Sequence, residues 1–476
     1  MKRLFIIPVI LLFSQISFAV DSSYWRDGFI QGRDLFYNLD GGVFKVYGKN
    51  LNDVKLSLGE NSSEQFSVYD FKILRDQVLF LNKIKYDYYC QSYSLTTFKQ
   101  TFNVPCAPGS LNVSPDQKYF AVDWYGKVAS CTGPDKMTDL PIYSAKSGKA
   151  VSTVQQICGR LSFGENNKAY SFQRAKERTN GFLRLSLLEI NIETNQVEIL
   201  YDKLNSAYVN VEDIASIKMA WDGRVLGFVA HFQTWYKNEA PGSFSSFYIF
   251  NIKQKTFESF GADVYGTGFM TNSGFFKSAD GDFIYRPYKD GTSKTDPVSS
   301  WGAAANFTPL NDEIMYSNVG YDRNKLVVAK YNSQTSLLTT TLLPTSDTMT
   351  SAFNSTTLKG KNIFYLSNGK LFMLDMATMT SRTVLQTLPP SDVETRVSAS
   401  DDQSVVLIWT HMKGKPTFRF YNTTSGALIA ERTNYDGEYN CENLSSLYAL
   451  SVKVSAESRK ALIQCGADRS IALVTY

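Results

Sequence analysis

A short pattern recurs along this chain: a turn rich in Asp, Gly, Asn or Lys, followed by a run of β-forming residues. The clearest copy runs from Ser114 to Lys118 and precedes the strand-like run Tyr119–Val122. Asp, Asn and Gly suit tight turns, and β-branched and aromatic residues suit half-buried strands. One such unit cannot bury its own apolar face, so units repeated at intervals of tens of residues must stack on one another. The repetition therefore predicts an all-β repeat architecture.

Each turn begins a unit of four expected strands. After the first strand pair, most units continue with a strand, a polar hinge and a further strand, as in Leu187–Ile192 followed by Glu193–Asn195. No long stretch shows helical periodicity, so the strands are expected to be joined by hairpin turns. The turns centre near Arg75–Asp76, Asp116, Glu165–Asn167, Asp222–Gly223, Asp280–Gly281, Asn311–Asp312, Lys359–Gly360, Asp401–Asp402 and Glu457–Ser458.

Four-stranded units of about 40 to 60 residues repeated around a ring form a β-propeller. We expect a single β-propeller of four-stranded blades. Asp280 and Asn311 are too close in sequence for two blades. Merging them into one unit predicts eight blades, with seven as the alternative. The last unit, from Leu447 to Tyr476, supplies only about three strands. A strand near Gly42–Tyr47 is expected to complete it, because closing the ring removes exposed strand edges.

The motif Ser114-Pro115-Asp116-Gln117-Lys118 resembles the Ser-Pro-Asp-Gly-Lys repeat of TolB-like and WD-repeat-like propellers. The resemblance covers most of Phe66–Tyr476, with this one close copy and several degenerate ones. Trp221-Asp222 falls in a turn and not at a strand end, so the Trp-Asp signature of true WD repeats is not matched. The resemblance implies protein partners at the cell envelope.

The first residues are read as a leader. Lys2 and Arg3 form a basic start, Leu4–Phe13 is mostly apolar, and Ser17-Phe18-Ala19 offers small residues for cleavage. These features are typical of a secretory signal peptide. We expect cleavage after Ala19, a lead-in over residues 20–35, the propeller over residues 36–476, and a periplasmic or secreted location. No stretch reaches about 18 consecutive apolar residues, so no transmembrane segment is expected.

Charge excludes some classes of partner. The formal net charge is +4, and it falls to +2 when Lys2 and Arg3 leave with the leader. Such a small charge does not support nucleic-acid binding. Charged residues are only 20% of the chain and aromatics are 14%, which suits sheets better than helical bundles. We expect a monomer.

The cysteines indicate which face of the ring carries the longest loops. In a blade, the first and third connections lie on one face, here called the turn face. The second connections and the links between blades lie on the other, here called the link face. The alignment places all six cysteines, and the longest loops Tyr125–Leu140, Gln233–Phe247 and Tyr288–Ala303, on the link face. An even count in an exported chain favours disulfides. Near-neighbour pairing suggests Cys90–Cys106, Cys131–Cys158 and Cys441–Cys465, with Cys106–Cys131 as an alternative.

Aromatic and charged residues near expected strand ends form the candidate binding site. Flat rings suit sugars or extended peptides, because they offer area at little entropic cost. The alternative is that the rings pack the loops and the blade edges. Asp123, His411 and Arg286 fall at matching positions of different blades, where they are expected to line the channel mouth. The full candidate set is Asp123, Trp124, His231, Trp235, Arg286, Trp301, Trp409 and His411.

Catalytic signatures are mostly missing from the sequence. It contains no G-x-S-x-G elbow, P-loop, calcium loop or dinucleotide fingerprint. With two histidines in the chain, a multi-histidine metal site is poorly supported. We therefore predict no metal, no cofactor and no catalytic residue. The leading interpretation is a non-enzymatic scaffold that binds an envelope or extracellular protein, or a glycan, through the link face. The alternative is a polysaccharide lyase or glycosidase.

Overall fold

The computed structural model describes residues 25–476 with internal gaps. The expected leader, residues 1–19, lies outside the described residues. The gaps are residues 41, 60–65, 124–137, 180–181, 205–209, 220–224, 235–241, 252–254, 263–267, 271–273, 280–281, 288–293, 298–307, 310–313, 320–324, 333–336, 345–361, 376–377, 379, 392–394, 413–414, 439–450 and 466–469.

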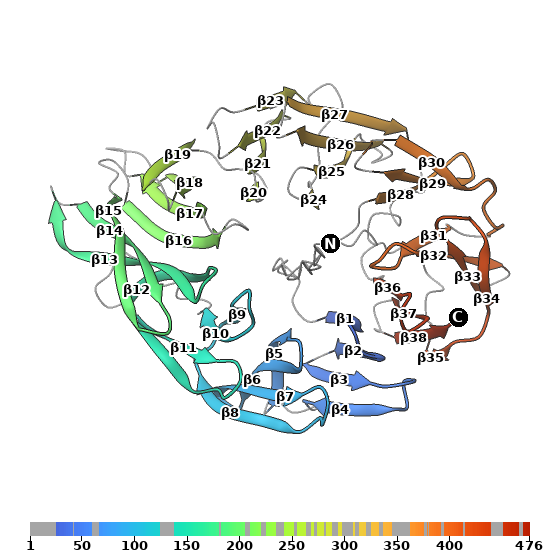
Figure 1. Ribbon diagram of the computed structural model, residues 1–476, viewed down its shortest axis with the longest axis horizontal. Helices are drawn as coiled ribbons and strands as arrows, with labels where there is room; N and C mark the ends of the chain where they lie inside the picture. The colour runs from blue at the N-terminus through green and yellow to red at the C-terminus, as the bar shows by residue number, and fades with distance from the viewer. Residues whose placement is uncertain are drawn as a thin grey trace, which may run out of the picture.

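The named elements of the described residues are all strands, and they form nine antiparallel sheets arranged around a ring (Figure 1). The first sheet contains β1 (Trp25–Ile30), β2 (Leu35–Asp40), β3 (Val43–Tyr47) and β4 (Val54–Leu58). The second contains β5 (Phe66–Ile73), β6 (Gln77–Ile84), β7 (Asp87–Ser94) and β8 (Gln100–Cys106). A seven-stranded sheet follows, with β9 (Ser110–Val113), β10 (Tyr119–Asp123), β11 (Thr138–Ser144), β12 (Ala150–Phe163), β13 (Lys168–Thr179), β14 (Phe182–Asn191) and β15 (Gln196–Leu204).

The remaining sheets continue around the ring in chain order. The fourth sheet contains β16 (Asn210–Met219), β17 (Val225–Thr234), β18 (Gly242–Asn251) and β19 (Thr256–Ala262). The fifth contains β20 (Gly268–Met270), β21 (Gly274–Ala279), β22 (Asp282–Pro287) and β23 (Lys294–Pro297). The sixth contains β24 (Thr308–Pro309), β25 (Ile314–Val319), β26 (Lys325–Asn332) and β27 (Leu337–Pro344). The seventh contains β28 (Asn362–Ser367), β29 (Lys370–Asp375) and β30 (Thr380–Leu385). The eighth contains β31 (Arg396–Ala399), β32 (Val405–Met412), β33 (Lys415–Asn422) and β34 (Leu428–Arg432). The last contains β35 (Asp436–Gly437), β36 (Ser451–Ser455), β37 (Lys460–Cys465) and β38 (Ser470–Thr475).

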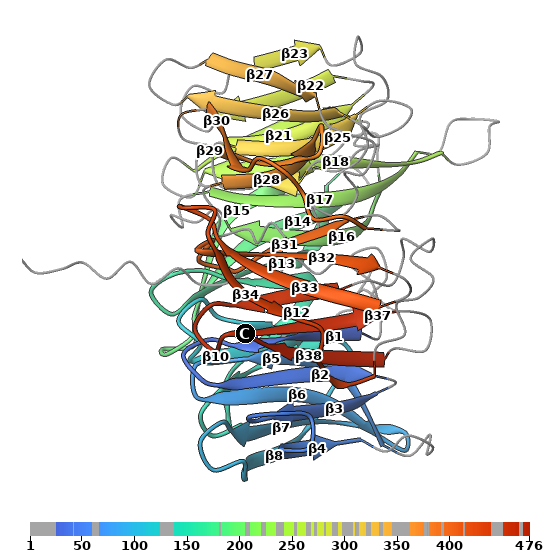
Figure 2. The ribbon, with the colours of Figure 1, turned by 90° about the vertical axis from the view of Figure 1, so that its right-hand side faces the viewer.

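The core lies between neighbouring sheets, so strands in the middle of a sheet are buried on both faces. In β6, Val78 and Phe80 pack toward the first sheet, whereas Leu79 and Leu81 pack toward the third. Double burial explains why these strands are continuous apolar runs and do not alternate with polar residues. Figure 2 shows the ring from its side, with the strands running between its two faces. This is the arrangement expected of a β-propeller.

The strand β12 links two four-stranded groups without a loop. Its first part pairs with β11, and its last part pairs with β13, with a register shift between Cys158 and Ser162. The seven-stranded sheet therefore contains two groups of the blade type that share one strand. Neither eight nor seven blades is confirmed by the nine described sheets.

Merging the turns at Asp280 and Asn311 into one unit was wrong. The strands β20–β23 and β24–β27 form two separate four-stranded sheets. Both fit into a short stretch of sequence because several of their strands are short: β20 has three residues, β23 has four and β24 has two.

The expected closing strand was also wrong. Val43–Tyr47 is β3, and it pairs with β2 and β4 inside the first sheet. The C-terminal sheet takes its fourth strand from β35, which pairs with β38. The first sheet has its own inner strand, β1, which lies in the range 20–35 expected to precede the fold. All four strands β1–β4 therefore belong to the first sheet, and the last sheet is completed by β35.

The first and last sheets are neighbours in the ring (Figure 1), and side-chain packing joins them at a contact we call the seam. Phe36 stacks on Tyr47, with ring centroids 4.9 Å apart, and both pack against Leu462 and Leu473. Polar contacts also cross the seam. Lys460 Nζ lies 2.6 Å from Asp34 Oδ1, and the backbone N–H of Leu51 donates to Asp436 Oδ2 at 2.9 Å.

The turn face is tied together by backbone hydrogen bonds between first and third connections. The N–H of Ala145 donates to the carbonyl of Lys118 at 2.8 Å, and the N–H of Thr423 donates to Ser404 at 3.0 Å. The N–H of Tyr476 donates to Arg459 at 2.9 Å in the last sheet. These bonds confirm that first and third connections share one face of the ring.

The Ser114 turn has a second, structurally matching copy. Ser114 Oγ donates to Asp116 Oδ1 at 2.7 Å and accepts from the N–H of Tyr119 at 3.0 Å. The side chains of Ser400 and Asp402 repeat this arrangement at 2.6 Å. The residue after each Asp is a Gln with positive φ, 61° at Gln117 and 58° at Gln403, whereas the resembling repeats have Gly there.

Candidate functional site

The eight residues expected to form a binding site lie on several sheets. Trp124, Trp235 and Trp301 lie outside the described residues. The others belong to four different sheets: Asp123 ends β10, His231 lies in β17, Arg286 lies in β22, and Trp409 and His411 lie in β32. The five described candidates are therefore spread over four sheets of the ring.

Trp409 and His411 are interior residues. Trp409 is 2% exposed and belongs to the cluster that packs β32 and β33 against the last sheet. Its indole Nε1 is buried and has no hydrogen-bond partner among the described residues. His411 is 5% exposed, and its backbone N–H donates to Ser391 Oγ at 3.1 Å. Their burial favours a packing role over an exposed aromatic rim.

Asp123 connects neighbouring groups of strands. Its Oδ1 accepts a hydrogen bond from the backbone N–H of Leu161, in β12, at 3.4 Å. The carbonyl of Leu161 accepts from Asn112 Nδ2 at 2.6 Å. These bonds tie β9 and β10 to the final part of β12, so the carboxylate of Asp123 has a structural partner in the ring.

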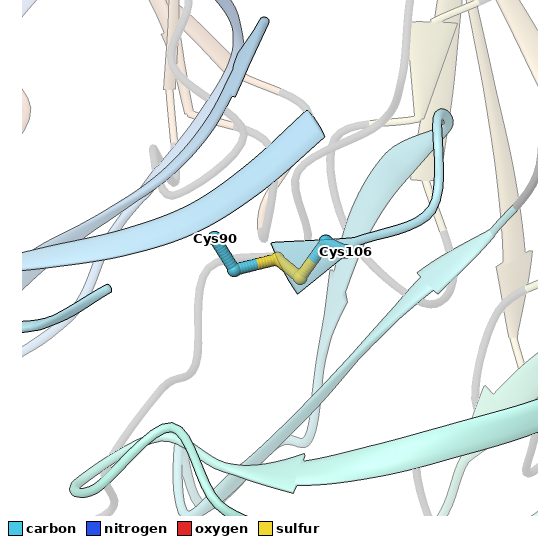
Figure 3. The surroundings of a disulfide bond; sticks show 2 residues. All are labelled: Cys90 and Cys106. Atoms are coloured by element: carbon cyan, nitrogen blue, oxygen red, sulfur yellow. A yellow bond between two sulfur atoms is a disulfide. The ribbon is translucent and has the colours of Figure 1, made fainter. Parts of the chain in front are cut away.

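One disulfide is described, and it is the first of the predicted pairs. Cys90 and Cys106 are bonded, with their Cα atoms 5.7 Å apart (Figure 3). They lie on the paired strands β7 and β8, where Cys106 is opposite Tyr88 and Cys90 is opposite Val104. The alternative pair Cys106–Cys131 is thereby excluded. Cys131 and Cys441 lie outside the described residues, and Cys158 and Cys465 lie in β12 and β37.

Three tyrosines lie near the link-face end of this disulfide-bonded sheet. We call Tyr69, Tyr86 and Tyr88 the tyrosine cluster. Tyr69 lies in β5 and is 46% exposed, and its ring makes an edge-to-face contact with Tyr88 at 5.5 Å and 89°. Tyr86 forms the β6–β7 turn with Lys85 and is 92% exposed. That turn is a second connection, so the cluster lies on the link face.

A β-bulge turns Tyr69 outward. The pairing of β5 with β6 shifts between Val68 and Asp70, which places Tyr69 at the bulge. Val68 and Asp70 are 6% and 7% exposed, whereas Tyr69 between them is 46% exposed. Bulges commonly redirect a side chain near a functional site. Periodicity alone does not reveal a bulge, but the run Tyr86-Asp87-Tyr88-Tyr89 beside Cys90 was a visible signal that sequence reasoning missed.

Electrostatic effects on the turn face have structural causes. Burial by itself would raise the pKa of Asp116. Hydrogen bonds from Ser114 Oγ and the Lys118 N–H, together with the Lys118 ammonium, have the larger effect and hold the pKa below its usual range. Burial, with the nearby charge of Asp402, raises the pKa of Tyr476 to about 12. Both groups support the turns and lie away from the tyrosine cluster.

The described residues contain neither a metal-binding cluster nor a membrane-spanning helix. Within the described ranges, no group of three or more His, Cys, Asp or Glu side chains is arranged to hold a metal ion. The same ranges contain no helix long and apolar enough to cross a bilayer.

Comparison with known proteins yields structural similarity only. No family model matches the chain, and no curated protein matches it. Among solved structures, a eukaryotic initiation factor is 9% identical with a TM-score of 0.36, covering 96% of this chain and 86% of its own. A prolyl endopeptidase is 11% identical with a TM-score of 0.37, covering 75% and 55%. TolB from Acinetobacter baumannii is 12% identical with a TM-score of 0.24, covering 76% and 78%. Similarity at this level carries no statement about function.

Proposed function

We propose that this chain is an exported, non-enzymatic binding scaffold that engages a protein or a glycan of the cell envelope or extracellular space through its link face. The tyrosine cluster is the observation that carries the proposal. It places exposed aromatic side chains on a sheet that a disulfide cross-links, and exposed loops on a rigid scaffold are where binding residues concentrate.

The difference between the two faces supports this choice. On the turn face, Ala145, Thr423 and Tyr476 use their backbone N–H groups to bond neighbouring turns. Each of these bonds lies within one sheet and joins residues at its turn-face end. On the link face, the β6–β7 hairpin projects Tyr86, which is 92% exposed. A large exposed aromatic ring costs free energy unless something covers it, so such residues often mark interaction sites.

The Cys90–Cys106 bond supports export. Disulfides persist in oxidising compartments and are rare in the reducing cytosol. Together with the basic and apolar start of the chain, the bond favours a mature protein that begins after Ala19 and acts in the periplasm or outside the cell. The proposed scaffold acts there as a monomer.

Fractionation and face-directed variants test the proposal. The full chain with a C-terminal tag is expressed in a bacterial host, and its location and mature N-terminus are determined. The purified protein is then mixed with washed cell-envelope preparations and sedimented. We expect cosedimentation to fall in Tyr86→Ala and to persist in Lys146→Ala, a matched change of an exposed residue on the turn face. Cytosolic retention, or equal sedimentation of both variants with the wild type, would contradict the proposal.

A further inference from the structure

We propose that the tyrosine cluster is a stacking site for a neutral glycan, with Tyr69 and Tyr88 forming the platform for a pyranose ring and Tyr86 flanking it. This inference rests on the proposed function, because it assumes that the link face binds a partner. It goes further by naming the site and the chemical class of the ligand.

The platform is held in place from both neighbouring sheets. The N–H of Val68 donates to the carbonyl of Gly42 in the turn before β3 at 3.0 Å. On the other side of the bulge, Asp70 Oδ2 accepts from the N–H of Leu111 in β9 at 2.9 Å. Tyr69 therefore lies between two buried residues that are each bonded to an adjacent sheet. An aromatic side chain on such a fixed backbone loses little entropy when it binds a ligand.

The second ring of the platform is also restrained. Tyr88 is half-buried in β7, directly opposite Cys106, whose disulfide to Cys90 cross-links β7 and β8. Its edge-to-face contact with Tyr69 uses the edge of one ring and one face of the other. Tyr69 is 46% exposed, so part of this side chain is accessible to a ligand.

The composition of the surface favours a sugar over a protein. Large exposed aliphatic side chains occur on outer strands, such as Ile199 on β15 and Leu428 on β34, whereas the exposed large apolar residues around this hairpin are tyrosines. A phenol ring combines a flat apolar surface with a hydroxyl group, and this matches the C–H face and hydroxyl groups of a pyranose. A stable protein interface needs roughly 800 Å² on each partner, with an apolar centre.

Charge at the hairpin favours a neutral ligand. Lys85 and Asp87 are both exposed, on either side of Tyr86, and Lys83 is half-buried opposite Tyr88. Because charges of both signs flank the rings, the cluster lacks the strong single-sign field that would select a polyanion or a polycation.

The test measures saturation transfer by NMR from the purified mature protein to four neutral hexasaccharides: cellohexaose, laminarihexaose, maltohexaose and chitohexaose. We expect at least one to receive saturation on its ring C–H protons. Its affinity should fall about tenfold or more in Tyr69→Ala and Tyr88→Ala, since lost stacking of about 1.4 kcal/mol gives that factor. Tyr69→Phe keeps the ring and should stay within about threefold of the wild type.

Two controls keep the result interpretable. Tyr435 is 39% exposed and makes its own edge-to-face contact, with Phe418 at 6.4 Å, so Tyr435→Ala removes a comparable tyrosine elsewhere and should leave binding unchanged. Tyr86→Ala changes a side chain that is 92% exposed and so reports on the site without a folding defect. It should weaken binding.

Two outcomes overturn the inference: no transfer to any of the four sugars, or equal transfer in the wild type and in Tyr69→Ala. The envelope sedimentation assay then shows whether only the glycan site is wrong or the proposed scaffold function is wrong as well. If sedimentation still depends on Tyr86, the proposed scaffold function stands with a protein partner. If it does not depend on Tyr86, both proposals fail.

Discussion

Gln403 offers a quantitative test of how neighbouring sheets are joined. Its backbone has φ of 58°, a left-handed conformation that costs a non-glycine residue roughly 1 kcal/mol. Its side chain is 8% exposed and bonds the backbone of Asn362 in the preceding sheet twice. Oε1 accepts from the Asn362 N–H at 3.1 Å, and Nε2 donates to the Asn362 carbonyl at 2.8 Å. The two bonds together should contribute about 2 kcal/mol.

The Gly and Ala variants separate these two effects. Gln403→Ala loses both bonds and keeps the backbone strain, so it should lower the free energy of unfolding by about 2 kcal/mol. Gln403→Gly also loses both bonds but relieves the strain, so its net loss should be about 1 kcal/mol.

Gln117 is the matched control. It occupies the same turn position, with φ of 61°, but it is exposed. Its side chain bonds the backbone of the preceding sheet once: Oε1 accepts a hydrogen bond from the N–H of Arg75 at 2.8 Å. The lost bond and the relieved strain should nearly cancel, so Gln117→Gly should change stability by less than about 0.5 kcal/mol.

Urea unfolding provides the measurement, with midpoints compared only among variants of equal slope. A chain of many sheets need not unfold in one step, so the transition is followed by fluorescence and by circular dichroism together. The reasoning is refuted if Gln403→Gly is as stable as the wild type, or if the same change at Gln117 costs as much.

Three further predictions follow from the described contacts. Replacing Cys90 and Cys106 by Ser should lower the free energy of unfolding by about 3 kcal/mol, given their sequence separation of 16, and a reductant should shift the urea midpoint of the wild type equally. Phe36→Ala should cost about 3 kcal/mol and speed hydrogen exchange in the first and last sheets before the others; uniform exchange would argue against a separable seam. The depressed pKa of Asp116 means that its contribution is present above about pH 4 and is lost as the pH falls through its folded value. Ser114→Ala should therefore flatten the dependence of the urea midpoint on pH below about pH 4.

Sequence reasoning succeeded where a few adjacent residues decide the structure. The turn at Ser114–Asp116 and its following strand were predicted, and the structure shows the Ser and Asp side chains capping that turn. The pairing of Cys90 with Cys106 was also predicted from nearness in the chain. Antiparallel hairpins bring near neighbours together, so sequence distance is a good guide to contact within one sheet.

The candidate site was predicted less well, because exposure depends on the neighbouring sheet. Trp409 and His411 were placed near a strand end, but both are buried, and the packing of β32 against the last sheet covers Trp409. Tyr69 was not singled out, because the bulge that exposes it arises from a register shift between β5 and β6. A shift of one residue reverses the face on which a side chain lies, and no local pattern records it.

The elements could be predicted from local sequence patterns: short strands, the turns that join them, the division into a turn face and a link face, and one disulfide. These depend on backbone preferences and hairpin connections that act over a few residues. Three other features depend on how the sheets pack. They are the number of sheets, the shared strand β12, and the contact in which Phe36 and Tyr47 of the first sheet pack against Leu462 and Leu473 of the last. Those outcomes depend on contacts between residues hundreds of positions apart, which become favourable only when the sheets come together around the ring.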